Sequence, residues 1–120
     1  MARILIVEDD EPVRSLAARA LERDGHSVDT AEDGEIGLDL IRAASGGYDL
    51  VVSDIRMPGM DGIAMAQAAV TAFPSLRIML VTGYAEQRER AAELDGVIVD
   101  VVQKPFTLTQ IREKVREHLA

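Results

Sequence analysis

Residues 49–62 read DLVVSDIRMPGMDG, and this stretch decides the fold. A short, continuous, valine-rich apolar run is typical of a strand covered on both faces, as strands of parallel sheets are. The run is followed by Asp54, and the turn-forming residues 57–62 separate this carboxylate from the next helical pattern. We therefore predict a buried strand whose carboxyl end exposes Asp54 at the edge of a sheet.

Similar runs and amphipathic helical patterns alternate along the rest of the chain. The other apolar runs occupy residues 4–7, 27–31 (the weakest), 78–81 and 97–102. Apolar stripes at helical spacing cover residues 13–21, 36–44, 63–73 and 108–119, and residues 85–94 predict a short helix with few large apolar side chains. The order of strand then helix, repeated five times, predicts a doubly wound α/β fold with a five-stranded parallel sheet and five helices.

Composition limits the function classes that this chain can serve. Its 120 residues suit one domain, residues 1–120, and the formal charge of −8 disfavours direct binding of nucleic acid. There is no cysteine, which excludes disulfides and thiol chemistry. The apolar runs are too short for a signal sequence or a membrane span. We expect a cytoplasmic protein that contacts neither membranes nor nucleic acid.

Three adjacent acids, Glu8-Asp9-Asp10, follow the first apolar run. One interpretation is a solvated turn or a helix cap, with Asp10 or Glu11 as the capping residue. If the apolar runs 4–7 and 50–52 are neighbouring strands, Glu8, Asp9 and Asp54 lie within a few ångströms and repel by roughly 1 kcal/mol or more per pair. A divalent cation relieves that repulsion, and Mg²⁺ is the natural choice when a phosphate must be coordinated too.

Thr82 and Lys104-Pro105 follow two other apolar runs. Thr82 alone is consistent with an ordinary strand end, and Lys104 alone with a flexible surface lysine. Because parallel strands end at one edge, we expect both to converge on Asp54, with a cis Lys104–Pro105 bond as one way of fixing the loop. A carboxylate can attack phosphorus when a metal and an ammonium neutralise the phosphoryl oxygens, so the set predicts phosphoryl transfer onto Asp54.

This combination resembles the receiver domain of two-component response regulators, of which the chemotaxis regulator CheY is the best-known single-domain case. The segments that carry the resemblance are ILIVEDDEPVR (4–14), DLVVSDIRMPGMDG (49–62), LVTGYAE (80–86) and VVQKPF (101–106). The resemblance implies sheet order 2-1-3-4-5, Asp54 as phosphoacceptor and Thr82 and Lys104 as switch hydroxyl and phosphate-sensing lysine. It also implies Mg²⁺ held by Asp9, Glu8, Asp54 and the backbone carbonyl of Arg56.

One position departs from the family pattern. The family usually has Tyr or Phe three residues before the lysine, where this chain has Val101. The departure puts the usual threonine–aromatic switch in doubt, although Tyr84 can take part instead. Arg56 and Tyr84 each lie two residues beyond a site residue, at positions that tune phosphoryl lifetime in the family. We expect the bulk of Tyr84 to slow attack by water.

The resemblance also implies partners. The phosphoryl donor would be a histidine kinase or a histidine phosphotransfer protein, and we expect a standalone receiver that is not otherwise an enzyme. Output would run through protein binding at residues 85–94, 97–102 and the last helix, and segments 83–91 and 104–115 resemble CpdR-type regulators of proteolysis. The residues that we expect to dock the kinase flank the pocket: Pro12, Val13, Leu16, Phe106 and Thr107.

Other classes of protein remain as alternatives. A haloacid-dehalogenase-type phosphatase needs a second acid two residues after its nucleophile, where this chain has Arg56. A flavodoxin-like domain needs a Ser/Thr-rich phosphate loop where this chain has residues 8–11, which are acidic. A phosphorylation-independent interaction domain, a relay intermediate and a phosphate sink also remain open. His26 and His118 lack partners at metal-ligand spacing, so we predict structural surface roles for them.

Overall fold

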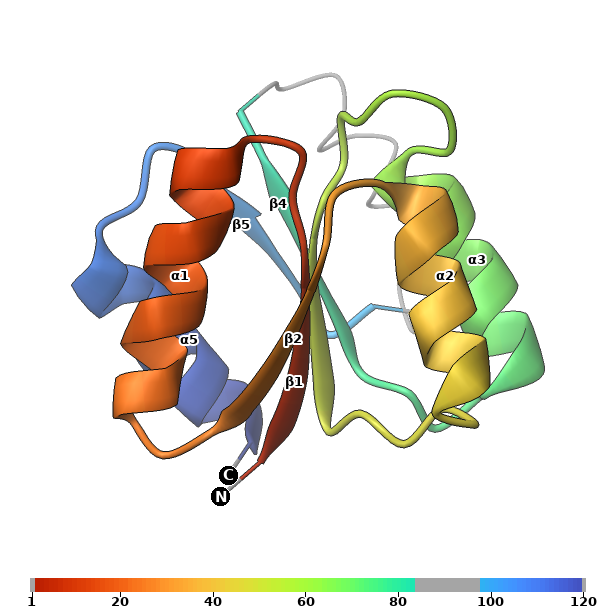
Figure 1. Ribbon diagram of the computed structural model, residues 1–120, viewed down its shortest axis with the longest axis horizontal. Coiled ribbons are helices and arrows are strands. Elements are labelled where there is room, and N and C mark those ends of the chain that lie inside the picture. Colours follow the sequence, from red (N-terminus) through yellow and green to blue (C-terminus); the bar gives the residue numbers. More distant parts are fainter. Residues whose placement is uncertain (1, 84–97, 120) are drawn as a thin grey trace.

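The computed structural model describes residues 2–83 and 98–119, and its centre is one parallel five-stranded sheet (Figure 1). The strand order is β2-β1-β3-β4-β5. This result confirms the predicted α/β class and the strand order that the family resemblance implied. The strands are β1 (Arg3–Val7), β2 (Ser27–Ala31), β3 (Leu50–Asp54), β4 (Ile78–Thr82) and β5 (Asp100–Gln103).

Helices cover both faces of the sheet, with α1 and α5 on one face and α2 and α3 on the other (Figure 1). Their bounds are α1 (Glu11–Arg23), α2 (Gly34–Ala43), α3 (Gly62–Ala72) and α5 (Leu108–Leu119). The described residues thus contain four of the five predicted helices. The fifth, predicted at residues 85–94, lies outside the described part of the chain, as does Tyr84.

Each face of the sheet has its own aliphatic core. Leu5 and Val51 belong to the buried cluster beneath α2 and α3, whereas Ile4 and Val52 belong to the cluster beneath α1 and α5. Successive side chains of a strand point to opposite faces, so a continuous apolar run fills both clusters. Burial on both sides is the reason that these strands lack the alternation of polar and apolar residues seen in half-exposed sheets.

Side-chain caps define where the helices begin. Asp10, Asp33 and Asp61 each accept a hydrogen bond from the backbone N–H three residues on, at 3.3, 2.8 and 2.8 Å. At α5, the N–H of Gln110 donates to Thr107 Oγ1 at 3.1 Å, and Gln110 Oε1 accepts from the N–H of Thr107 at 2.7 Å. This reciprocal pair is a capping box. Of the two candidate caps of the first helix, Asp10 and Glu11, Asp10 is the capping residue.

The strand order reverses between β1 and β3, which are hydrogen-bonded neighbours with Val7 opposite Ser53. The connection after β1 leads to α1 on one face of the sheet and that after β3 leads to α3 on the other, so a crevice forms between the carboxyl ends of these two strands (Figure 1). Glu8 directly follows β1, and Asp54 is the last residue of β3. The predicted adjacency of the two acidic strand ends is therefore confirmed.

Candidate functional site

A cavity of about 970 Å³ opens at this crevice. Its walls come from the segments that follow β1, β3, β4 and β5, which are far apart in the sequence. The residues that line it are Glu8, Asp9, Asp10, Val13, Asp54, Arg56, Met57, Pro58, Gly83, Lys104, Pro105 and Phe106. The carboxyl ends of the strands thus gather the predicted acids and the predicted lysine into one site.

Lys104 bridges two of the carboxylates. Its Nζ lies 3.2 Å from Glu8 Oε2 and 3.2 Å from Asp54 Oδ2. The side chains of Glu8 and Asp54 are only 7% and 9% exposed, whereas that of Lys104 is 29% exposed. Lys104 is therefore part of the site and is not a flexible surface lysine.

Burial shifts the pKa values of both carboxylates that contact Lys104. Burial, and after it the charge of Asp54, raise the pKa of Glu8 to about 7, while Lys104 opposes the shift. Burial also raises the pKa of Asp54, against the lowering effect of Lys104. Burial acts to lower the pKa of Lys104, but the charges of Asp54 and Glu8 raise it overall. The ammonium therefore stays protonated beside the two acids.

The acids of this site fit a hard divalent cation. One carboxylate oxygen from each of Glu8, Asp9 and Asp54 lies within 4.8 Å of the other two. Among the described residues, these three acids form the group whose potential ligand atoms lie close enough together to share one metal ion. Mg²⁺ is bound in proteins by one or two carboxylates together with water and substrate phosphates, and a solvent-open acidic cavity can supply such a shell. Its charge would favour the ionised form of carboxylates whose pKa values burial raises.

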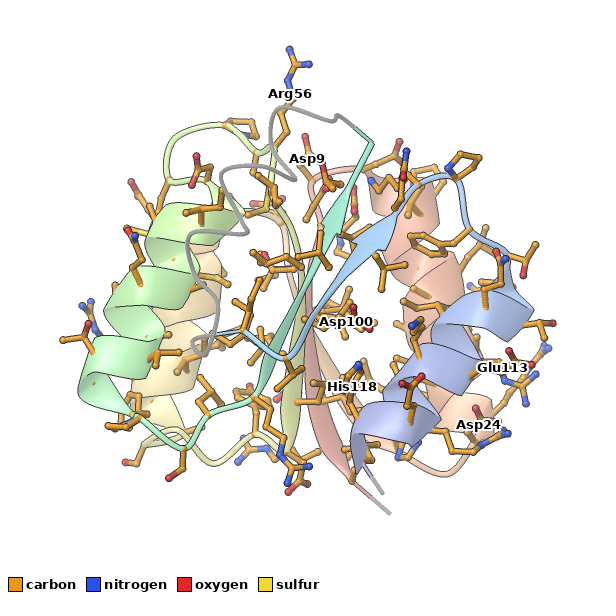
Figure 2. The ribbon with its side chains drawn as sticks, turned by 180° about the vertical axis from the view of Figure 1, so that it is seen from behind. Asp9, Asp24, Arg56, Asp100, Glu113 and His118 are labelled. Atoms are coloured by element: carbon orange, nitrogen blue, oxygen red, sulfur yellow. The ribbon has the colours of Figure 1, made fainter. Side chains whose placement is uncertain are left out.

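Arg56 lies on the loop between β3 and α3, and its side chain projects away from the molecule above the end of the sheet that carries Asp9 (Figure 2). Its predicted contribution of a backbone carbonyl to the metal remains a prediction.

Thr82 and Val101 are placed by β4 and β5. Thr82 ends β4 with only 1% of its surface exposed, and its neighbour Gly83 lines the cavity. The Lys104 N–H donates to the Thr82 carbonyl at 2.7 Å, which joins the two strand ends behind the site. Val101 is half-buried against the cluster beneath α2 and α3. The predicted roles of Thr82, Tyr84 and Val101 in switching remain predictions.

The residues predicted to dock a kinase lie beside the cavity on α1 and on the segment between β5 and α5. Val13 and Phe106 line the cavity, and Leu16 is 52% exposed. Pro12 and Thr107 are exposed as well. Two of the five residues, Val13 and Phe106, therefore line the cavity, and the predicted docking role of all five remains a prediction.

Two residues contact the site in ways that the sequence pattern did not reveal. Gly62 at the start of α3 packs against the backbone of Asp54, where a Cβ atom would overlap the Asp54 carbonyl. Arg14 on α1 donates from a guanidinium nitrogen to the Glu8 carbonyl at 2.8 Å. In both contacts, one segment of the chain packs against the backbone of another, and the spacing of residues in the sequence does not reveal such contacts. The predicted cis Lys104–Pro105 peptide bond is confirmed.

The two histidines lie away from the site and are half-buried. His26 Nδ1 accepts from the N–H of Ala2 at 3.2 Å, and His118 Nε2 lies 2.9 Å from Asp100 Oδ2 (Figure 2). His118 is only 17% exposed, so its predicted surface position is inaccurate, although the contact with β5 is structural. In the described part of the chain, neither histidine belongs to a group of potential metal ligands.

A doubly wound α/β domain with clustered carboxylates and a lysine at its switch point is the arrangement of a phosphoryl-accepting signalling domain. The chain belongs to the response regulator receiver domain family, whose sequence model matches residues 4–116. Receiver domains bind Mg²⁺ at an acidic pocket and interact with histidine kinases or phosphotransfer proteins. They act as signalling proteins of two-component systems.

Similarity to individual proteins agrees with this family. The chain is 39% identical to the response regulator MprA of Mycolicibacterium vanbaalenii over 114 residues, which are 95% of this chain and 48% of MprA. It therefore spans about half the length of the curated relatives it matches. In the described residues, no helix is both long and apolar enough to cross a membrane.

Solved structures match over nearly the whole fold. The response regulator TrrA of Thermotoga maritima, in complex with Mg²⁺ and BeF, superposes with a TM-score of 0.87 at 34% identity, covering 99% of this chain and 100% of that one. The receiver domain of the hybrid histidine kinase CckA superposes with a TM-score of 0.83 at 33% identity, covering 98% of this chain and 99% of that one. At 34% and 33% identity, both structures resemble this chain in sequence as well as in fold.

Proposed function

We propose that Asp54 accepts a phosphoryl group with the help of Mg²⁺, and that the phosphorylated domain signals by binding another protein. The observation that carries the proposal is the contact of Lys104 Nζ with both Asp54 Oδ2 and Glu8 Oε2 at 3.2 Å. A buried nucleophilic carboxylate, a fixed ammonium and additional acids in one solvent-open cavity are the parts that phosphoryl transfer to aspartate requires.

In the proposed reaction, a carboxylate oxygen of Asp54 attacks the phosphorus of a phosphohistidine donor. The P–N bond breaks as the new P–O bond forms, the imidazole leaves after taking a proton, and Asp54 becomes an acyl phosphate. Hydrolysis later returns the carboxylate and releases inorganic phosphate. Most of the acceleration comes from positioning the groups and from neutralising charge on the phosphoryl oxygens.

Each remaining site residue has a role in this scheme. Lys104 exchanges its contact with Asp54 Oδ2 for one with a phosphoryl oxygen, and the Thr82 hydroxyl donates to another. Glu8, Asp9, Asp54 and the Arg56 carbonyl would hold the metal, which would supply positive charge that stabilises the phosphoryl group. Arg56 and Tyr84 lie two residues beyond Asp54 and Thr82 in the sequence and are proposed to set how long the acyl phosphate lasts.

We assign the donor to a histidine kinase or a histidine phosphotransfer protein. Such a donor must bring a phosphohistidine to Asp54 across the rim of the cavity. The rim includes Val13 and Phe106, with Leu16 one turn further along α1. Exposed apolar side chains next to a polar cavity suit a protein partner that covers the site during transfer.

A second function, protein binding without phosphorylation, is favoured by one observation. Val101 occupies the β5 position where the family carries an aromatic switch residue, and an aliphatic side chain that is already half-buried has little to move inward. Relay of the phosphoryl group to a further histidine would also suit a domain with this site. The two are separated by whether a partner binds equally before and after phosphorylation.

Incubation with acetyl phosphate and Mg²⁺, followed by intact-protein mass spectrometry, tests the proposal. We expect an increase by the mass of one phosphoryl group in the wild-type protein. The adduct should be absent from Asp54→Asn and from wild-type protein treated with EDTA, and Asp49→Asn is the matched control. An adduct that persists in Asp54→Asn, or no adduct in the wild type, would exclude phosphoryl acceptance at this residue.

A further inference from the structure

The backbone around Asp9 is held from two sides. The peptide group before Asp9 carries the Glu8 carbonyl, which accepts from Arg14 Nη1 at 2.8 Å. The peptide group after Asp9 carries the Asp10 N–H, which donates to Glu8 Oε1 at 3.2 Å. Holding both flanking peptide groups restricts φ and ψ of Asp9. The direction in which its carboxylate leaves the chain is therefore set by these two bonds.

Asp9 has little else to hold it. The residue is exposed, and within the described part of the chain no hydrogen bond or ion pair of its own side chain is recorded. Glu8, in contrast, is buried and bonded to Lys104. The N–H of Glu8 is also fixed, because it donates to the carbonyl of Ala31 at the end of β2 at 3.0 Å. The orientation of the Asp9 carboxylate therefore depends on the backbone that carries it.

Arg14 is well placed to supply that support. Its own N–H donates to the Asp10 carbonyl at 2.9 Å within the first turn of α1, so the residue is anchored to the loop at both its backbone and its guanidinium. The side chain is half-buried, which limits competition from water for this bond. A hydrogen bond from a charged donor is about twice as strong as one between neutral groups.

We propose that Arg14 is a positioning residue for the metal site, which orients Asp9 by holding the Glu8 carbonyl. The inference rests on the proposed function, since it concerns the Mg²⁺ that phosphoryl transfer would use. It goes further by assigning a role to a cation that does not touch the metal ligands' carboxylates in the described contacts. Residues that orient ligands from behind commonly change metal affinity by about 10- to 100-fold.

Position and charge predict opposite results for the variant Arg14→Met. If Arg14 acted only through its positive charge near an acidic cluster, removing that charge would strengthen Mg²⁺ binding. If it orients Asp9, removing it weakens Mg²⁺ binding, by about tenfold at the lower end of the range for such residues. The matched control is Arg19→Met, which removes the same charge from an exposed position on the same helix.

An NMR-followed Mg²⁺ titration of the three proteins provides the affinities, and amide hydrogen exchange in EDTA provides a metal-free measurement. We expect weaker binding and faster exchange at the Asp9 and Asp10 amides in Arg14→Met, with Arg19→Met like the wild type. Unchanged or tighter binding in Arg14→Met would overturn the inference. Should that variant not fold, Arg14→Lys keeps the charge, and wild-type affinity and exchange in it would overturn the inference equally.

The two proposals fail in different ways. If the wild-type protein shows no Mg²⁺ uptake at all, the proposed function fails. If the wild type binds Mg²⁺ and Arg14→Met binds it as well with unchanged exchange at Asp9 and Asp10, only the positioning role of Arg14 fails.

Discussion

The raised pKa of Glu8 makes the stability of the folded protein depend on pH. This pKa is raised from 4.5 to about 7, mainly by burial and then by the charge of Asp54. A folded-state pKa above the unfolded value means that the folded protein binds the proton more tightly. The energetic penalty is therefore absent below pH 4.5, grows as the pH rises toward 7 and is complete above that pH.

We predict that Glu8→Gln removes this pH dependence. Measured by urea unfolding in EDTA, the wild type should lose about 1–2 kcal/mol more stability than Glu8→Gln as the pH rises from 4.5 to above 7. The estimate is discounted because the cavity is open to solvent, which screens charge. The same change at exposed Glu22 is the control. Parallel curves for wild type and Glu8→Gln would contradict the prediction.

Lys104 is the second residue whose partners predict a measurable effect. Lys104→Met leaves the buried carboxylates of Glu8 and Asp54 without their cation, so we expect about 1–3 kcal/mol lower stability above pH 7 in the absence of metal. Mg²⁺ binding should persist, because the acids remain. Lys114→Met breaks ion pairs of a side chain that is 41% exposed and should cost less than about 1 kcal/mol. Equal losses in the two variants would argue against the buried cluster.

At the scale of elements, the approach of α3 to β3 fixes where Asp54 sits. The Gly62 N–H donates to the Ile55 carbonyl at 2.8 Å, and any Cβ on Gly62 would overlap the Asp54 carbonyl. The helix start can therefore approach the end of the strand only because residue 62 has no side chain. Asp61 caps the same helix and aligns this contact.

Gly62→Ala should destabilise the protein by about 1–3 kcal/mol, because the added methyl displaces either α3 or the end of β3. Phosphorylation by acetyl phosphate should slow as Asp54 shifts. Gly83→Ala is the control, since its Cβ would meet only Lys104 Cβ at 3.8 Å, an ordinary contact. Thermal unfolding followed by circular dichroism compares the two. A Gly62→Ala variant as stable as Gly83→Ala would contradict the role of this contact.

The elements also show what the sequence could and could not reveal. The ends of the strands can be recognised in the sequence as the ends of apolar runs. Because parallel strands end at one edge of the sheet, Glu8, Asp54 and Lys104 could be predicted to meet. The contacts made by Arg14 and Gly62 depend on the distance between two packed segments, which residue types and spacing do not encode. The partnership of Asp100 with His118 was missed for the same reason, because it depends on how α5 lies against β5.

For the whole molecule, the sheet concentrates charge at one end that the fold itself does not neutralise. The carboxylates of Glu8, Asp9 and Asp54 come from the ends of two adjacent strands, and Lys104 contributes one positive charge. In the metal-free domain, the fold therefore keeps these carboxylates close together although they repel one another. A cation that binds only the folded state offsets this repulsion by mass action, which links stability to metal concentration.

Asp54→Asn should raise the stability of the metal-free domain and abolish its phosphorylation. Because the pKa of Asp54 is raised in the fold, mainly by burial, its ionised form opposes folding, and the neutral amide of similar shape should raise the melting temperature in EDTA. Mg²⁺ at ten times its dissociation constant should stabilise the wild type by about 1.4 kcal/mol. The variant, which has lost one ligand, should gain less at the same concentration, and acetyl phosphate should leave its mass unchanged. Asp39→Asn, which removes the same charge from an exposed position on α2, should behave as the wild type in both experiments. A lower melting temperature for metal-free Asp54→Asn would mean that the strand ends are stabilised by this carboxylate, and the charge-repulsion account of the site would then be wrong.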